Sequence, residues 1–168
     1  MAKFFRIFFM VFMASVLSGC ILQSKTPLFK EAEGVLLLGQ KKQRFASYER
    51  DGATWKKGTD TAIFDPQGHH YKVSSGKNYA TAEFISLGRE KYVMQFDEGK
   101  GSFVYILISP HGKEILLYAL LCDSLKKQNI AGVRFDKDNC FIEPSFGRSG
   151  FETLLKNLPA ASLKLQAE

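Results

Sequence analysis

The sequence predicts a mainly β domain, an antiparallel sandwich or an incomplete barrel that carries one C-terminal α-helix. Short runs rich in Val, Ile, Tyr and Phe recur along most of the chain, and polar turn residues separate them. Two turns contain a proline followed two residues later by glycine, and an apolar stripe at helical spacing stands near the C-terminus. About eight to ten short strands around one core account for this pattern.

The first strand candidates are residues 34–38 and 43–49. The first is a continuous apolar run, and the second contains Phe45 and Tyr48 in a polar setting. Arg50-Asp51-Gly52 then predicts a turn, because glycine readily adopts the positive φ that a tight connection needs.

Proline and glycine mark two hairpins, at Asp65-Pro66-Gln67-Gly68 and at Ser109-Pro110-His111-Gly112. Proline presets φ for the first turn position and glycine takes the left-handed one. The hairpins join residues 61–65 to 70–73 and residues 103–108 to 114–121. Residues 79–87 and 91–97 are the strand candidates between them. In the last of these, Tyr92, Met94 and Phe96 alternate with their neighbours, which predicts one buried face.

The C-terminal part predicts helix as well as strand. Residues 123–128 suit one or two helical turns, and residues 133–135 and 140–142 suit a last hairpin. Ser149 and Glu152 have capping-box spacing at the start of a helix that we expect to end before Pro159. Its apolar stripe should pack on the sheet: Phe151, Leu154, Leu155 and Leu158. Residues 160–168 show no clear period.

The N-terminus has the parts of a secretory signal. Lys3 and Arg6 give a positive start, and residues 7–17 form an apolar run within the roughly 7 to 15 residues of such signals. The run is too short to span a bilayer, which needs about 20 apolar residues in a helix.

This run ends in a tetrapeptide that resembles the lipobox of bacterial lipoproteins, Leu17-Ser18-Gly19-Cys20. The resemblance covers only the first twenty residues. It implies cleavage between Gly19 and Cys20, attachment of lipid to the Cys20 thiol, and acylation of the new amino terminus in many bacteria. The alternatives are a signal peptide that happens to contain cysteine and an uncleaved anchor. More than one acyl chain makes attachment to a membrane effectively permanent.

The resemblance therefore divides the chain into a signal peptide (1–19), a lipidated tether (20–30) and a single mainly β domain (31–168). It implies a lipid-anchored protein of the bacterial cell envelope. Ile21 stands where an aspartate would resemble an inner-membrane retention signal, so a cell with two membranes is expected to place the protein in the outer one.

Charge gives little support for nucleic-acid binding. Loss of Lys3 and Arg6 with the signal lowers the formal charge from +6 to +4, and the remaining basic residues form no cluster. We expect no nucleic-acid partner. Weak attraction to anionic lipids or envelope polymers remains open.

Cys122 and Cys140 are the two cysteines left once Cys20 carries lipid. An even pair in an oxidising compartment predicts a disulfide. Two free thiols or a metal pair are the alternatives, and neither cysteine has a Cys or His neighbour at zinc-ligand spacing.

Catalytic and metal-binding patterns are absent from the sequence, so we expect no enzyme and no cofactor. His69 and His70 point to opposite faces of a strand, and His111 lies on a turn. Residues 136–139 superficially resemble a calcium loop but lack its glycine and its closing glutamate. No Gly-x-Ser-x-Gly nucleophile motif occurs.

Trp55, Lys56 and Lys57 form the one candidate binding surface. An aromatic ring beside two lysines is typical of a surface that binds a partner. The alternative is a tryptophan that covers the open end of a β core, which would show the same sequence pattern. Three functions remain: an envelope lipoprotein that binds a protein partner or a wall component without catalysis, an envelope hydrolase or its inhibitor, and a structural or surface-exposed protein without a dedicated ligand.

Overall fold

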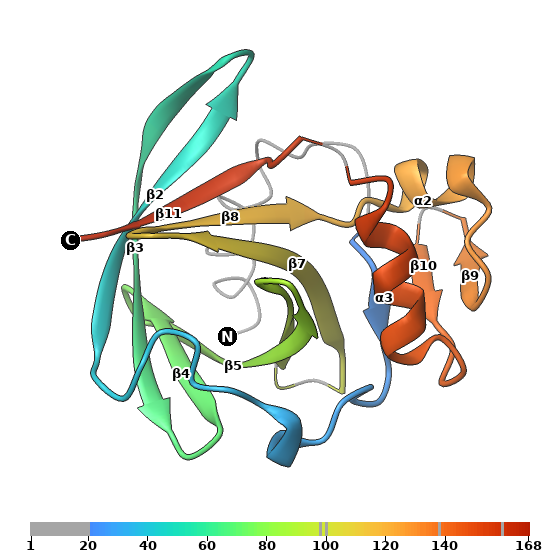
Figure 1. Ribbon diagram of the computed structural model, residues 1–168, viewed down its shortest axis with the longest axis horizontal. Coiled ribbons are helices and arrows are strands. Elements are labelled where there is room, and N and C mark those ends of the chain that lie inside the picture. Colours follow the sequence, from blue (N-terminus) through green and yellow to red (C-terminus); the bar gives the residue numbers. More distant parts are fainter. Residues whose placement is uncertain (1–20, 98, 100, 138, 159) are drawn as a thin grey trace.

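The computed structural model describes residues 21–97, 99, 101–137, 139–158 and 160–168 (Figure 1). The segment predicted as a signal peptide, the lipobox-like tetrapeptide with Cys20, and Pro159 lie outside the described residues. The elements are, in chain order, β1 (Gln23–Ser24), a 3-10 helix η1 (Glu31–Glu33), β2 (Gln43–Asp51), β3 (Thr54–Gln67), β4 (His70–Ser75), β5 (Asn78–Gly88), β6 (Lys91–Asp97), β7 (Phe103–His111), β8 (Glu114–Ala119), α2 (Cys122–Gln128), β9 (Val133–Asp136), β10 (Asn139–Ile142), α3 (Gly147–Leu155) and β11 (Leu163–Ala167).

Eight antiparallel strands close into a barrel. Their order is β6-β5-β4-β3-β2-β11-β8-β7, and β7 pairs with β6 to complete the circle. The mainly β prediction is confirmed, and the sheet is closed. The closing strand is β11, which lies between β2 and β8 with Leu163 opposite both Glu49 and Leu117. Residues 160–168, which show no clear period in the sequence, thus contain a strand that the sequence analysis did not predict.

Both predicted hairpins form, but their turns lie further along the chain than predicted, at Gly68-His69 and Gly112-Lys113. Pro66 and Pro110 are strand residues that pair with Tyr71 and Ile115. The hairpins join β3 to β4 and β7 to β8 in antiparallel pairs. The β2–β3 hairpin is longer than predicted and projects from the barrel (Figure 1). Only residues 63–67 of β3 pair with β4, whereas its pairing with β2 continues to the tip of the hairpin.

The barrel interior is filled by side chains that alternate along the strands. Met94 and Phe96 of β6 point into this core, as the alternation predicts. Four aromatic rings pack edge to face or tilted at its centre: Phe45, Phe64, Tyr71 and Phe84. The interior is consequently a packed core and not an open channel.

Residues 34–38 are not a strand, contrary to the prediction. They form a loop in which Leu36, Leu37 and Leu38 lie against the barrel core and Val35 is exposed. The Val35 amide donates to the Phe84 carbonyl at 2.8 Å, and the Leu38 amide donates to the Tyr71 hydroxyl at 3.0 Å. Burial against the core accounts for the continuous apolar run that resembled a strand.

A second apolar layer covers the outer face of β5, β6 and β7. Phe151 and Leu154 of α3 are buried in it, and the Phe151 ring lies 5.6 Å from the ring of Tyr105. The helix packs on the sheet as predicted, but it begins at Gly147 after Phe146 and has no side-chain cap. The predicted capping box of Ser149 and Glu152 is therefore not formed. A further helix, α2, matches the predicted residues 123–128 within one position.

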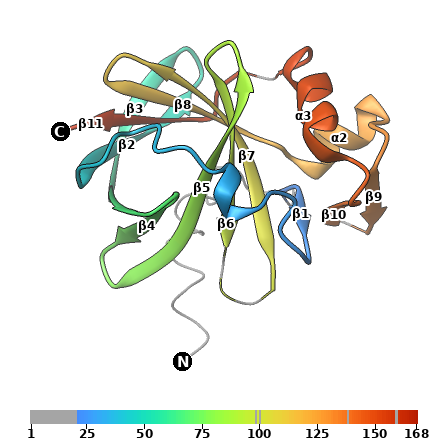
Figure 2. The same ribbon diagram turned by 60° about the horizontal axis from the view of Figure 1, so that its bottom comes forward.

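The segment predicted as a tether is part of the fold. Ile21 is 5% exposed and Leu22 is fully buried. The strand β1 pairs with β7 and, in parallel, with β10 (Figure 2). Residues 21–29 are therefore held against the barrel and not free as a linker. Within the described residues, no helix has the length and apolar character needed to cross a membrane.

Candidate functional site

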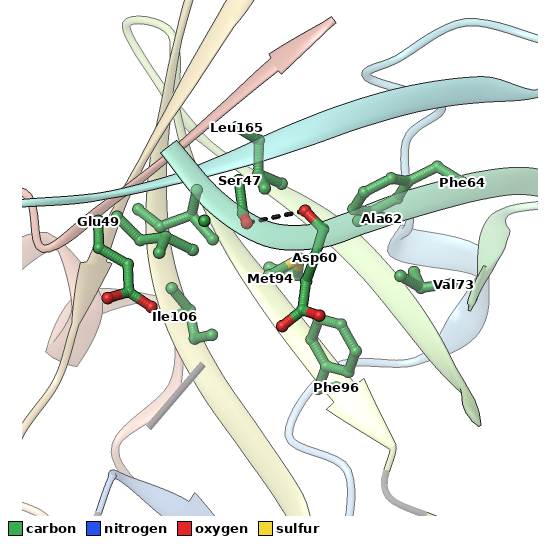
Figure 3. Close-up of a pocket in the computed structure, with 13 residues that line it drawn as sticks. Ser47, Glu49, Asp60, Ala62, Phe64, Val73, Met94, Phe96, Ile106 and Leu165 are labelled. Atoms are coloured by element: carbon green, nitrogen blue, oxygen red, sulfur yellow. Dashed lines mark hydrogen bonds between the residues drawn. The ribbon is translucent and has the colours of Figure 1, made fainter. Parts of the chain in front are cut away.

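A pocket opens into the barrel beside the projecting β2–β3 hairpin (Figure 3). Its floor is apolar and comes from six strands, with Phe64, Val73, Met94, Phe96, Ile106 and Leu117 among the lining residues. Its polar lining residues come from β2 and β3: Ser47, Glu49, Gly58 and Asp60. The pocket thus combines an apolar floor with an acidic mouth.

A bulge in β3 shapes the mouth. The register between β2 and β3 shifts around Ser47, so that residues 58–60 lie opposite this single residue. The Ser47 hydroxyl donates to the Asp60 carbonyl at 2.8 Å. Gly58 is required by close approach, because a Cβ at this position would lie 2.6 Å from the Ser47 Oγ. Bulges commonly stand next to sites because they redirect side chains.

The carboxylates of Glu49 and Asp60 are the polar groups at the mouth. Both side chains are half-buried and point toward the pocket (Figure 3). Within the described chain, neither carboxylate forms an ion pair or a side-chain hydrogen bond. Partly desolvated carboxylates without a partner favour a positively charged or hydrogen-bond-donating ligand group.

The size of the pocket limits what it can hold. The cavity volume is about 40 Å³. Since a water molecule needs roughly 10 to 15 Å³ on this measure, the space accommodates a few waters or the end of an apolar chain. A whole lipid does not fit while the aromatic core is packed.

The three residues of the predicted binding surface do not share one face. Trp55 is half-buried, with the Arg50 guanidinium 5.9 Å and the Lys164 ammonium 5.6 Å from its ring. Lys56 pairs with Asp51 across the hairpin, and the hydrogen bond and charge of Asp51 raise the Lys56 pKa. Lys57 is exposed. The Trp55 ring therefore packs against the side chains of Arg50 and Lys164.

The three histidines have different surroundings. His70 Nδ1 is 2.9 Å from a Glu31 oxygen, and His111 Nε2 is 3.1 Å from the Ser109 hydroxyl. His69 is exposed on a turn. In the part of the chain that the structure describes, no three His, Cys, Asp or Glu side chains are placed to hold a metal ion. Of the residues that resemble a calcium loop, Asp136 ends β9 and Asn139 begins β10, while Asp138 lies outside the described residues.

The predicted disulfide is present. Cys122 of α2 and Cys140 of β10 are bonded, with Cα atoms 5.4 Å apart. Both cysteines are buried in the outer apolar layer. The bond therefore fastens the short helix to the β9–β10 hairpin and not to the barrel wall.

Sequence reasoning missed Glu49 and Asp60 as site residues. Each is a single acidic residue in a polar stretch, and their convergence depends on the bulge and on barrel closure by β11. In comparisons with protein-family models, with curated proteins and with solved structures, none matched this chain.

Proposed function

We propose that the protein is a lipid-anchored bacterial envelope protein that binds a protein partner and has no catalytic activity. In this proposal the barrel pocket receives an apolar side chain of the partner, and a neighbouring basic residue meets Glu49 and Asp60. The observation that carries the binding role is the apolar pocket with two unpaired carboxylates at its mouth.

The anchor rests on the N-terminal sequence. A basic start, a short apolar run and Leu17-Ser18-Gly19-Cys20 support lipid attachment at Cys20, and the Cys122–Cys140 bond is in keeping with an oxidising compartment. The absence of catalysis is supported by the pocket itself. Among the described lining residues, Ser47 is the one with a hydroxyl and it donates to a backbone carbonyl, and none is a histidine, lysine or cysteine that could activate it.

Met94 provides a direct probe of the pocket. The other methionines are Met1, Met10 and Met13, so the mature chain has a single methionine and it lines the pocket floor. Protein labelled with ¹³C-methyl methionine should give one signal, which can be followed by NMR. We expect hexylammonium to shift this signal at lower concentration than hexanol, and hexanoate to shift it least.

The variants Glu49→Gln and Asp60→Asn should each weaken hexylammonium binding by about three-fold, since a partly exposed ion pair contributes up to about 1 kcal/mol. Hexanol binding should not change. Glu152→Gln, on the exposed side of α3, is the matched control and should behave as the wild type. If none of the three compounds shifts the Met94 signal, or if hexanoate shifts it at the lowest concentration, the proposed pocket is refuted.

A further inference from the structure

The described chain is bonded to the folded domain from its first residues, Ile21 and Leu22. Ile21 forms a backbone bridge with Leu121. The Leu22 amide donates to the Leu120 carbonyl at 2.9 Å, and the Leu22 carbonyl accepts from the Tyr105 amide at 3.1 Å. A lipid on Cys20 would thus be attached directly to a packed strand. The domain would then keep one face toward the bilayer.

A second cleft lies next to β1. It is formed by residues 24–28 on one side and by the β9–β10 hairpin with Glu143 and Pro144 on the other, and its volume is about 330 Å³. Two cations line it, Lys25 and Arg134, together with apolar groups that include Pro27 and Leu28.

The two cations are available for a ligand. Neither Lys25 nor Arg134 forms an ion pair with any other described residue. The Arg134 guanidinium lies 5.6 Å from the Phe141 ring, which holds it at the cleft. Among the described lining residues Glu143 is the one acidic side chain, so they carry two positive charges and one negative charge.

We infer that this cleft binds the phosphate head group of an anionic phospholipid in the membrane to which the protein is anchored. The inference rests on the proposed anchor for the position of the bilayer. Five residues of extended chain span at most about 18 Å, so Lys25 lies within that distance of the lipid on Cys20. Guanidinium and ammonium groups bind phosphate oxygens, and the apolar lining of the cleft suits the adjoining glycerol and acyl carbons.

The residues after β1 lie at one end of the barrel. Ser24 pairs with Phe103 at the start of β7, so residues 25–28 continue at the same end as the 97–103 connection. The β4–β5 turn with exposed Tyr79 lies at this end too (Figure 2). Tyrosine and lysine side chains are common at membrane interfaces.

Native mass spectrometry of the processed full-length lipoprotein tests the inference. Protein released from nanodiscs of phosphatidylglycerol should retain one such lipid, and protein from phosphatidylcholine nanodiscs should retain none. The variant Lys25→Gln/Arg134→Gln should retain the anionic lipid about 25-fold less, at about five-fold for each cation removed near an anionic surface. The control Lys41→Gln/Lys113→Gln loses the same charge at the opposite end of the barrel and should retain lipid like the wild type.

The same spectra separate this inference from the proposed anchor, because acyl chains on Cys20 add covalent mass. An acylated protein that retains both lipids equally, or whose double variant retains phosphatidylglycerol undiminished, overturns the cleft assignment and leaves the anchor standing. An unacylated protein overturns the anchor. Equal competition by soluble glycerol phosphate would assign the cleft to a free phosphate ester and overturn the lipid assignment.

Discussion

The Gln95 side chain pairs with the Phe29 backbone as a neighbouring strand would. Its Nε2 donates to the Phe29 carbonyl at 3.1 Å, and its Oε1 accepts from the Phe29 amide at 3.1 Å. The same Oε1 accepts from the Leu28 amide at 3.0 Å, and Gln95 is only 2% exposed. One buried amide thus fixes the segment that follows the proposed lipid attachment.

Replacement of this amide should release the segment. We expect Gln95→Ala to lower the free energy of unfolding by about 3 kcal/mol, because it leaves the Phe29 amide and carbonyl without their partner, while the Leu28 amide keeps the Tyr105 hydroxyl. Amides of residues 28–29 should exchange hydrogen faster, while those of the barrel strands keep their protection. Gln67→Ala, at an exposed position of β3, is the control. Unchanged exchange at residues 28–29 would show that Gln95 does not hold the segment.

Removal of the disulfide should destabilise the outer layer. A loop closed over 18 residues is worth about 3 kcal/mol in the chain-entropy model. The double variant Cys122→Ala/Cys140→Ala should have a free energy of unfolding lower by about 3 kcal/mol, measured by chemical denaturation. Wild-type protein should change its electrophoretic mobility on reduction, and the double variant should not. Equal wild-type mobility with and without reductant would contradict the bond.

Gly58 and Ser47 should behave as a coupled pair. Gly58→Ala places a methyl group against the Ser47 Oγ and should cost about 2 kcal/mol, as overpacking commonly does. In the double variant Ser47→Ala/Gly58→Ala the obstructing oxygen is gone, and the remaining Ser47 atoms near the new Cβ are at 3.5 Å or more. The double variant should therefore be more stable than the sum of the single effects. If the two single effects on the free energy of unfolding add strictly in chemical denaturation, the bulge accommodates the new methyl group at position 58 without removal of the Ser47 oxygen.

Glu83 should make the stability depend on pH. Burial raises its pKa above the ordinary 4.5, although the hydrogen bond from Gln95 partly opposes the shift. Because the folded state holds this proton more tightly, the contribution of Glu83 is fully present below pH 4.5 and is lost as the pH rises through the folded pKa. Glu83→Gln should thus be more stable than the wild type at neutral pH, and the difference should vanish in acid. Glu152→Gln should show no such trend, and a constant difference for Glu83→Gln would contradict the shift.

Local sequence signals identified most of the barrel. The proline and glycine of Asp65-Pro66-Gln67-Gly68 marked a real hairpin, although the turn itself lies at Gly68-His69 and Pro66 belongs to the strand. The cysteine pair followed from count and compartment alone. These features need no knowledge of distant contacts.

The errors have a common physical cause in long-range packing. Leu36, Leu37 and Leu38 are apolar because they lie against the barrel core. Residues 163–167 form a strand because they pair with β2 on one side and with β8 on the other. Leu163 and Leu165 do alternate with polar neighbours, but five residues carry too little pattern to identify a strand. The convergence of Glu49 and Asp60 likewise depends on a bulge that no local motif marks.

The proposed anchor is tested most directly by the intact mass of the protein isolated from the membrane fraction, with tandem sequencing of its first residues. The account predicts a chain that begins at Cys20 and carries the added mass of two or three acyl chains on that residue. A chain that begins at Met1 with an unmodified Cys20 thiol would contradict it.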